Sequence, residues 1–141
     1  MKNIYEIFDE VANAKTAKDR VLVLQFNQSY ALKSVLKGMF DPNVQFVFDD
    51  VPPYKSSGAP PGLGYNNLHQ EMKKVYLFVK DDPRASPNLT MRRREQLLIQ
   101  LLESLESKEA EVFANMIRKK KNAVKGLTYG IVKEAFPDIL A

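Results

Sequence analysis

The chain has 141 residues, 45% of them hydrophobic and 27% charged, with a formal net charge of +4; this composition predicts one compact globular domain over residues 1–141 and excludes a fibre or a disordered tail. It has no cysteine and only one histidine, His69, which leaves thiol, zinc and Ser-His-Asp chemistry without their usual side chains, so we expect no enzyme, no metal and no cofactor. No apolar run is long enough to cross a bilayer and no charged-then-apolar leader opens the chain, so we expect a soluble intracellular protein with no membrane partner.

Three short amphipathic helices are predicted before residue 41. Apolar residues recur at spacings of three and four in this region, as expected for helices that bury one face. Thr16, followed three residues later by Asp19, has the pattern of a capping box that opens the second helix. The residues predicted to face the core are Ile4, Ile7, Phe8 and Val11 in the first helix, Val21, Leu22 and Leu24 in the second, and Leu32, Val35, Leu36 and Met39 in the third.

A long Pro/Gly-rich loop is predicted from about residue 41 to 65. Five prolines and three glycines interrupt this stretch, and only Val44, Phe46 and Phe48 alternate in the manner of a strand. A loop of this length is unusual in a small domain, which favours either a binding role or a flap over the core. We expect Tyr54 and Tyr65 to pack the loop onto the helices rather than to stack on bases.

Two helices are predicted between the loop and residue 105. Asn67 is expected to cap the first, which ends before Asp81 and carries Lys73 and Lys74 on its outer face. Thr90 is expected to cap a leucine-rich helix that runs from about residue 91 to 105. Because this helix has the strongest apolar pattern in the chain, we expect it to be central to the fold.

Two more helices complete the chain and give an all-α bundle of about seven helices. One begins at Ser107, and the other begins near Thr128 and is closed by Pro137. No internal repeat is present, which argues against a solenoid. Nothing in the sequence separates the pKa values of the acidic residues around the first of these helices, so we expect solvated faces rather than an acid–base pair at Glu103, Glu106, Glu109 and Glu111.

Two basic clusters, residues 92–94 and 118–125, are the strongest functional signals. Residues 71–141 hold 14 Lys and Arg against 10 Asp and Glu, whereas residues 1–70 hold seven of each. Such clusters neutralise phosphates with a salt-dependent and sequence-tolerant affinity. The alternative for both clusters is a solvated face. Glu95 or the Asp81–Asp82 pair can neutralise the first cluster, and the second cluster also complements the negative end of a helix. The candidate DNA-binding residues are Arg92, Arg93, Arg94, Arg118, Lys119, Lys120, Lys121, Lys125 and Thr128.

The closing block of the chain carries a resemblance to a known domain. Together with the opening helices, the long loop and the leucine-rich helix, the block from Met116-Ile117-Arg118 through Gly126-Leu127-Thr128 to Ala135-Phe136-Pro137 resembles the N-terminal DNA-binding domain of the ATP-dependent DNA ligases of T-even-type phages. The chain also resembles a family of small uncharacterised proteins of T-even-like phages that infect marine cyanobacteria. That resemblance rests on Leu68-His69-Gln70-Glu71-Met72-Lys73-Lys74 and Arg93-Arg94-Glu95-Gln96-Leu97.

The ligase resemblance implies an all-helical domain that holds duplex DNA by its backbone beside a nick. The ligases attack ATP with a lysine in a Lys-x-Asp-Gly tetrad, which this sequence lacks, and the chain ends at Ala141, where their adenylation domain would begin. We therefore expect no ligation. Arg118, Lys119, Lys120, Lys121, Lys125 and Thr128 fall in the ligase-like block, whereas Arg92, Arg93 and Arg94 are candidates on charge alone.

These observations predict a non-enzymatic protein that binds the DNA backbone without reading sequence, in the cytoplasm of an infected bacterial host. Two alternatives remain open: a module that binds a host or phage protein through the Pro-rich loop or the acidic helix, and a virion component. The placement of the two basic clusters discriminates DNA binding from the interaction module. Clusters on one face favour DNA binding, and clusters that point apart favour the interaction module.

Overall fold

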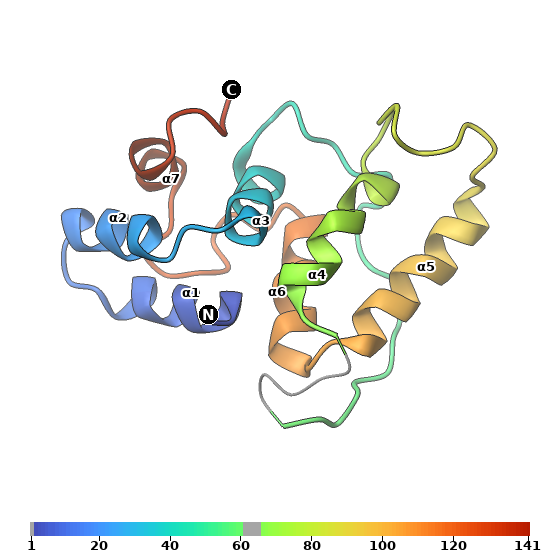
Figure 1. Ribbon diagram of the computed structural model, residues 1–141, viewed down its shortest axis with the longest axis horizontal. Coiled ribbons are helices and arrows are strands. Elements are labelled where there is room, and N and C mark those ends of the chain that lie inside the picture. Colours follow the sequence, from blue (N-terminus) through green and yellow to red (C-terminus); the bar gives the residue numbers. More distant parts are fainter. Residues whose placement is uncertain (1, 61–65) are drawn as a thin grey trace.

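A computed structural model describes residues 2–60 and 66–141, and in these ranges the chain forms seven α-helices and one 3-10 helix, with no strand (Figure 1). This confirms the all-α prediction. No helix in the described ranges is both long enough and apolar enough to span a membrane. The helices are α1 (Ile4–Asn13), α2 (Ala17–Phe26), α3 (Tyr30–Phe40), α4 (Leu68–Glu71), the 3-10 helix η1 (Met72–Phe78), α5 (Met91–Ser104), α6 (Ser107–Ile117) and α7 (Tyr129–Ala135).

Five helices begin directly after a Ser, Thr or Asn side-chain cap, and α6 begins after Glu106, whose side chain accepts a hydrogen bond from the N–H of Lys108. In each of the five, the side-chain oxygen of the cap accepts a hydrogen bond of 3.0 to 3.2 Å from the backbone N–H three residues later. Such a bond satisfies one of the N–H groups that a helix start leaves unpaired. Four of these five starts are confirmed predictions, and only the cap of α3 had no signal in our sequence analysis. The five caps are Thr16, Ser29, Asn67, Thr90 and Thr128.

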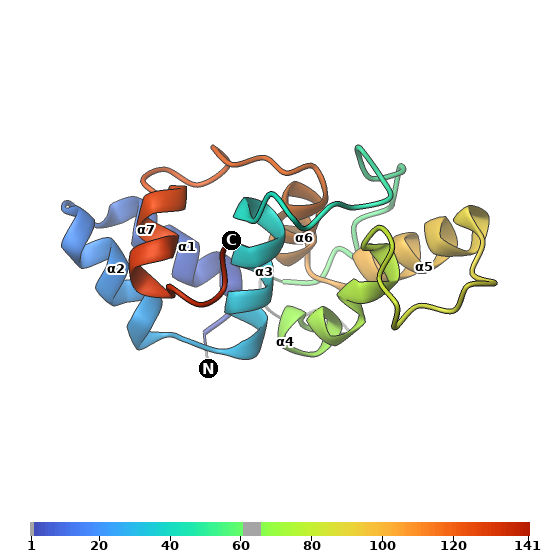
Figure 2. The same ribbon diagram turned by 90° about the horizontal axis from the view of Figure 1, so that it is seen from above.

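The helices pack in a row along the long axis of the molecule. Helices α1, α2 and α7 form one end, α3 and α6 pack together in the middle, and α4, η1 and α5 form the other end (Figures 1 and 2). One cluster of buried apolar side chains runs through this row and includes residues of all the helices. In its centre the ring of Phe78 meets the edge of Phe113, with centroids 6.0 Å apart, a favourable geometry for aromatic pairs.

The prediction that the leucine-rich helix is central is wrong. Helix α5 lies at one end of the molecule in both ribbon views (Figures 1 and 2) and packs on α6 and η1. Only Leu98, Leu101 and Leu102 are buried in it, and Met91 is 49% exposed. The first turn carries three arginines, and burying unpaired charges costs more free energy than the leucines return. The apolar stripe therefore anchors only the second half of the helix.

Two smaller expectations also need correction. Leu22 was expected to face the core but is 51% exposed, because Val21 and Leu24 already take the buried side of α2. The helix that Asn67 caps continues after one α-helical turn as the 3-10 helix η1. Its three-residue turn aligns Met72 and Phe78, both of which are buried.

The Pro/Gly-rich loop lies over the core as a flap in its described part, residues 41–60. Phe46 forms an isolated antiparallel bridge with Val79, and the flanking backbone hydrogen bonds are 2.9 and 2.7 Å long. Phe48 and Tyr54 pack against the buried cluster, which confirms the expectation for Tyr54. Tyr65 lies outside the described residues.

Candidate nucleic-acid interface

The two basic clusters lie in different parts of the molecule. Residues 92–94 form the first turn of α5, at one end of the row of helices. Residues 118–128 connect α6 to α7 and run behind α3 in the view of Figure 1, toward the opposite end (Figures 1 and 2). The clusters therefore do not form one continuous surface, and this separation adds support to the interaction module.

Two of the four consecutive cations at 118–121 hold the Pro/Gly-rich loop. The Nε of Arg118 donates a hydrogen bond of 2.5 Å to the carboxylate of Asp50. The Nζ of Lys119 donates to the backbone carbonyl of Asp41 at 2.8 Å and lies 5.5 Å from the ring centroid of Phe46. Both side chains therefore join the end of α6 to the loop, so their first role is structural.

The environment of Lys119 differs from that of a surface lysine. Burial lowers the pKa of its ammonium group, and the nearby Lys121 lowers it further, while Asp41 acts in the opposite direction. Its backbone adopts the left-handed conformation, with φ of +55°, so the chain turns sharply out of α6 at this residue.

The remaining lysines of the segment, Lys120, Lys121 and Lys125, are exposed. None of them forms an ion pair with any described acidic residue. Lys121 and Lys125 line a shallow hollow of about 380 Å³ together with Asn122, Thr128 and Tyr129. Three of the candidate residues predicted from the sequence are thus brought together around one concave surface.

The floor of this hollow is apolar. Phe40, Val124 and Leu127 form it, and Phe40 and Leu127 are almost completely buried. Phe40 comes from α3, far from the segment in sequence, and nothing in the local pattern points to it. Asn122 and Tyr129 are neighbours of the predicted residues, but an uncharged side chain gives no signal in a charge analysis.

The backbone of the segment is fixed by Gly126 and Arg20. Gly126 has φ of +78°, and a Cβ atom there would lie 2.7 Å from Cζ of Arg20 and against its Nε. The guanidinium of Arg20 also donates to the carbonyl of Ala14 at 3.1 Å. Arg20 of α2 thus packs against the segment at Gly126, a position where only glycine fits without strain.

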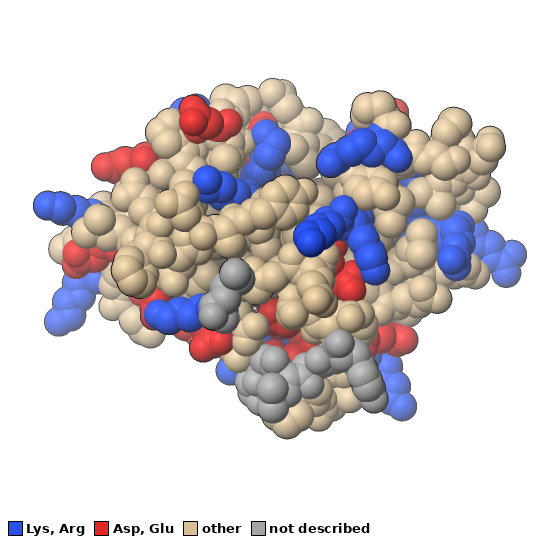
Figure 3. All heavy atoms as spheres, viewed as in Figure 1, with Lys and Arg blue, Asp and Glu red and all other residues tan. Residues whose placement is uncertain are grey.

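The arginines of α5 are exposed or half-buried and face solvent at the end of the molecule. Arg93 hydrogen-bonds to Gln96 at 3.3 Å and Arg94 contacts the sulfur of Met91. Lys and Arg side chains also lie over the α4–η1 region and near the start of α5 on the face drawn in Figure 3. Lys73 and Lys74 of η1 are exposed, as predicted, and Lys74 pairs with Glu71 at 3.2 Å.

The expectation of solvated acidic residues around α6 is wrong for two of them. Glu106 and Glu109 are 1% and 0% exposed, whereas Glu111 is exposed. Burial raises the pKa of Glu109, the backbone N–H of Leu68 opposes this shift, and the carboxylates of Glu106 and Glu6 raise the pKa further. The α-helical turn places Glu109 between α1 and α4, which sequence spacing alone does not show.

His69 is half-buried, and its Nε2 lies 2.9 Å from the carbonyl of Lys2. Within residues 2–60 and 66–141, no three His, Asp or Glu side chains are grouped in a way that could hold a metal ion.

The fold and this segment together define a helical protein with a shallow, apolar-floored hollow, lined by lysines that have no acidic partner in the described part of the chain. The chain matches DUF6433, a family of unknown function, over residues 7–123, and it belongs to that family. The matched range includes Lys120 and Lys121 and ends before Lys125 and Thr128. No curated protein matches the chain in sequence.

Proposed function

We propose that this protein binds the backbone of DNA without reading its sequence and has no enzymatic activity of its own. The observation that carries the proposal is the hollow beside α7, where Lys121, Lys125 and Thr128 lie together and both lysines lack acidic partners among the described residues. Exposed ammonium groups that replace condensed counterions supply affinity for any sequence. Lys120 adds a third charge on the same segment.

The other candidate residues take different roles in this proposal. Arg118 and Lys119 position the segment through Asp50 and Asp41. Their charges raise the positive electrostatic potential around the hollow, but the side chains do not contact phosphates directly. The arginines at 92–94 lie on a separate surface at the end of α5, so they provide a second and weaker contact to a more distant part of the DNA.

The resemblances support a finer form of the proposal. The ligase-like block at residues 116–137 supplies every lining residue of the hollow except Phe40, so the hollow lies mainly in the part of the resemblance that implies backbone binding. The resemblance to small proteins of cyanophages supports a phage origin and a site of action in the cytoplasm of the infected bacterium.

The test is fluorescence anisotropy with intact, nicked and single-stranded DNA, at low and near-physiological salt. We expect binding that falls steeply with salt. The variant in which Lys120, Lys121 and Lys125 are all replaced by Ala is expected to weaken binding and to flatten the dependence of log affinity on log salt by about two to three, because each lost phosphate contact removes about 0.9.

A matched control removes the same charge elsewhere. Lys15, Lys18 and Lys55 are exposed and unpaired among the described residues, and their replacement by Ala is expected to leave most of the affinity and slope unchanged. Equal losses in both variants would show that net charge, not the hollow, determines binding. No binding at low salt would refute the proposal.

A second candidate function, a protein-interaction module, is favoured by the separation of the basic clusters and by one exposed surface. Phe26 is 89% exposed and Leu22 is 51% exposed on α2, where they line a hollow together with Val23 and Asn27. The Pro-rich loop and the acidic helix, which the sequence suggested as docking surfaces, are less accessible to a partner protein. The described part of the loop packs on the core, and two glutamates of the acidic stretch are buried. Replacing Phe26 and Leu22 with Ser would remove this surface without altering the lysines.

A further inference from the structure

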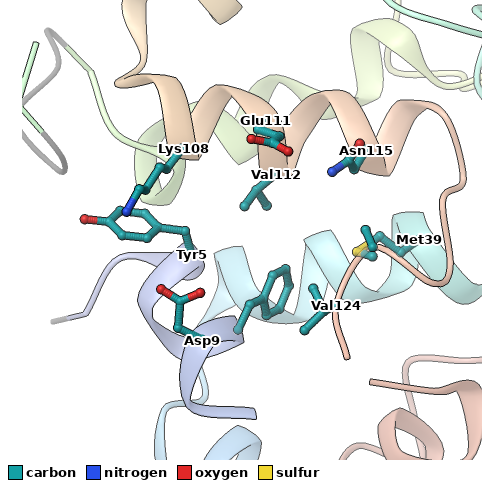
Figure 4. A pocket seen from close by; sticks show the side chains of 10 residues that line it. Tyr5, Asp9, Met39, Lys108, Glu111, Val112, Asn115 and Val124 are labelled. Atoms are coloured by element: carbon teal, nitrogen blue, oxygen red, sulfur yellow. The ribbon is translucent and has the colours of Figure 1, made fainter. Parts of the chain in front are cut away.

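A second hollow, distinct from the lysine-lined one, lies between α1, α6 and the 118–128 segment (Figure 4). Its volume is about 250 Å³. Phe8 and Met39 form a floor that is almost completely buried, and Val112 and Val124 form half-buried walls. This hollow, here called the α1–α6 cleft, has the apolar lining that small-molecule sites share.

The charged groups of the α1–α6 cleft lie at its rim. Asp9 projects from α1 and Glu111 projects from α6, so that the two carboxylates face the cleft from opposite sides (Figure 4). Neither carboxylate forms an ion pair with any described cation. Lys108 also lines the cleft, and its Nζ lies over the ring of Tyr5, 5.4 Å from the ring centroid.

This distribution of charge selects the sign of a ligand. Asp9 and Glu111 outnumber Lys108, whose ammonium group lies over the ring of Tyr5, so an anion entering the cleft would meet a net negative rim. A cation with an apolar body satisfies both parts, because its body replaces water on the floor and its charge lies near the carboxylates.

We propose that the α1–α6 cleft binds a small organic cation, an amine carried on an apolar body. The body contacts Phe8, Met39 and the two valines, and the ammonium group lies at the rim, where the carboxylates of Asp9 and Glu111 both attract it. This site does not depend on DNA binding, since none of the three exposed lysines of the 118–128 segment lines it.

The test compares three probes of similar shape: phenethylamine, phenethyl alcohol and phenylpropionate. Each is titrated into the full chain while the backbone amide signals of Ala123 and Val124, which border the cleft, are followed by NMR. We expect the amine to shift these signals at the lowest concentration, the alcohol to bind more weakly, and the anion to bind most weakly. Equal binding of amine and alcohol, or no shift with any probe, would overturn the proposal.

Charge-removing variants locate the ammonium group. Asp9→Asn and Glu111→Gln are each expected to weaken the amine by about two- to five-fold, as for partly exposed charge pairs, and to leave the alcohol unchanged. Glu134→Gln, an exposed residue of α7 outside the cleft, is the matched control and is expected to change neither probe. If the two cleft variants behave like the control, the carboxylates do not bind the amine and the proposal is wrong.

A filling variant tests the apolar part. Val112→Phe places a larger side chain in the cleft and is expected to abolish the shifts caused by both the amine and the alcohol. If this variant does not fold, the comparison of the two amide variants with Glu134→Gln still decides the proposal, because these changes alter charge and not volume.

Discussion

Gly126 holds the 118–128 segment against α2, and its replacement by Ala is expected to destabilise the protein. The new Cβ would require a non-glycine residue at φ of +78°, which costs about 1 to 2 kcal/mol. It would also press on the guanidinium of Arg20, with Cζ 2.7 Å away. Moving this side chain breaks its hydrogen bond to Ala14, which is worth about 1 kcal/mol. The expected loss is therefore about 2 to 3 kcal/mol of unfolding free energy.

A double-mutant cycle measured by urea unfolding separates the two contributions. In an Arg20→Ala background the steric contact is absent, so Gly126→Ala should cost only the backbone strain and the coupling between the sites should be about 1 kcal/mol. Gly130→Ala is the control. Apart from its chain neighbours and the backbone of its own helix, the nearest atom to its Cβ position is Oγ1 of Thr128, 3.9 Å away, and Ala in a helix stabilises by up to about 1 kcal/mol. Equal costs of Gly126→Ala in the two backgrounds would refute the proposed role of Arg20.

Two further predictions concern the core, and a third concerns a helix cap. Burial raises the pKa of Glu109, so the folded state binds the proton of this carboxyl more tightly than the unfolded state does. The resulting gain in unfolding free energy is complete below the pKa of the unfolded state. It is lost as the pH rises through the pKa of the folded state. Glu109→Gln should therefore gain stability over the native chain by up to about 1.4 kcal/mol per pH unit in that window, measured by urea unfolding from acid to neutral pH; parallel curves would contradict this. Gly38→Ala places a Cβ 2.7 Å from the sulfur of Met116 and should cost about 1 to 3 kcal/mol by forcing α3 and α6 apart, and an unchanged thermal midpoint would show that the sulfur moves freely. Thr128→Ala removes the hydrogen bond from the N–H of Ile131 and should cost about 1 kcal/mol in the same unfolding assay, whereas Thr128→Ser should restore most of it.

The elements that could be predicted from the sequence are those fixed by neighbours in the chain. Thr90 and Thr128 begin their helices because each needs only the N–H three residues later. The position of α5 could not be predicted in the same way, since apolar periodicity identifies the buried face of a helix but not its packing partner. Its arginine-rich first turn was visible in the sequence and, given more weight, would have placed it at an end.

The candidate site shows the same division between local and distant information. Charge clustering identified residues 118–125 but treated the cations as one group. Lys119 differs from Lys120 because its partner, the carbonyl of Asp41, lies 78 residues earlier in the chain, and only the tertiary structure brings them together. Glu109 was misjudged for the same reason, because the helices that bury it come from other parts of the chain.

The division of labour within the basic run explains how so many like charges can share one short segment. Arg118 and Lys119 are drawn to Asp50, Asp41 and the ring of Phe46, and these contacts bind the first part of the run to the loop. The left-handed turn at Lys119 then separates its side chain from those that follow. The first two cations are held by the loop, whereas the exposed lysines that follow have no acidic partner in residues 2–60 and 66–141. Their mutual repulsion is relieved by any anion that enters the hollow. If this account is correct, Asp50→Asn should weaken DNA binding only slightly in the anisotropy assay, because it loosens the loop while leaving every lysine in place. A loss as large as that of the triple lysine variant would instead show that Arg118 and the loop carry the binding.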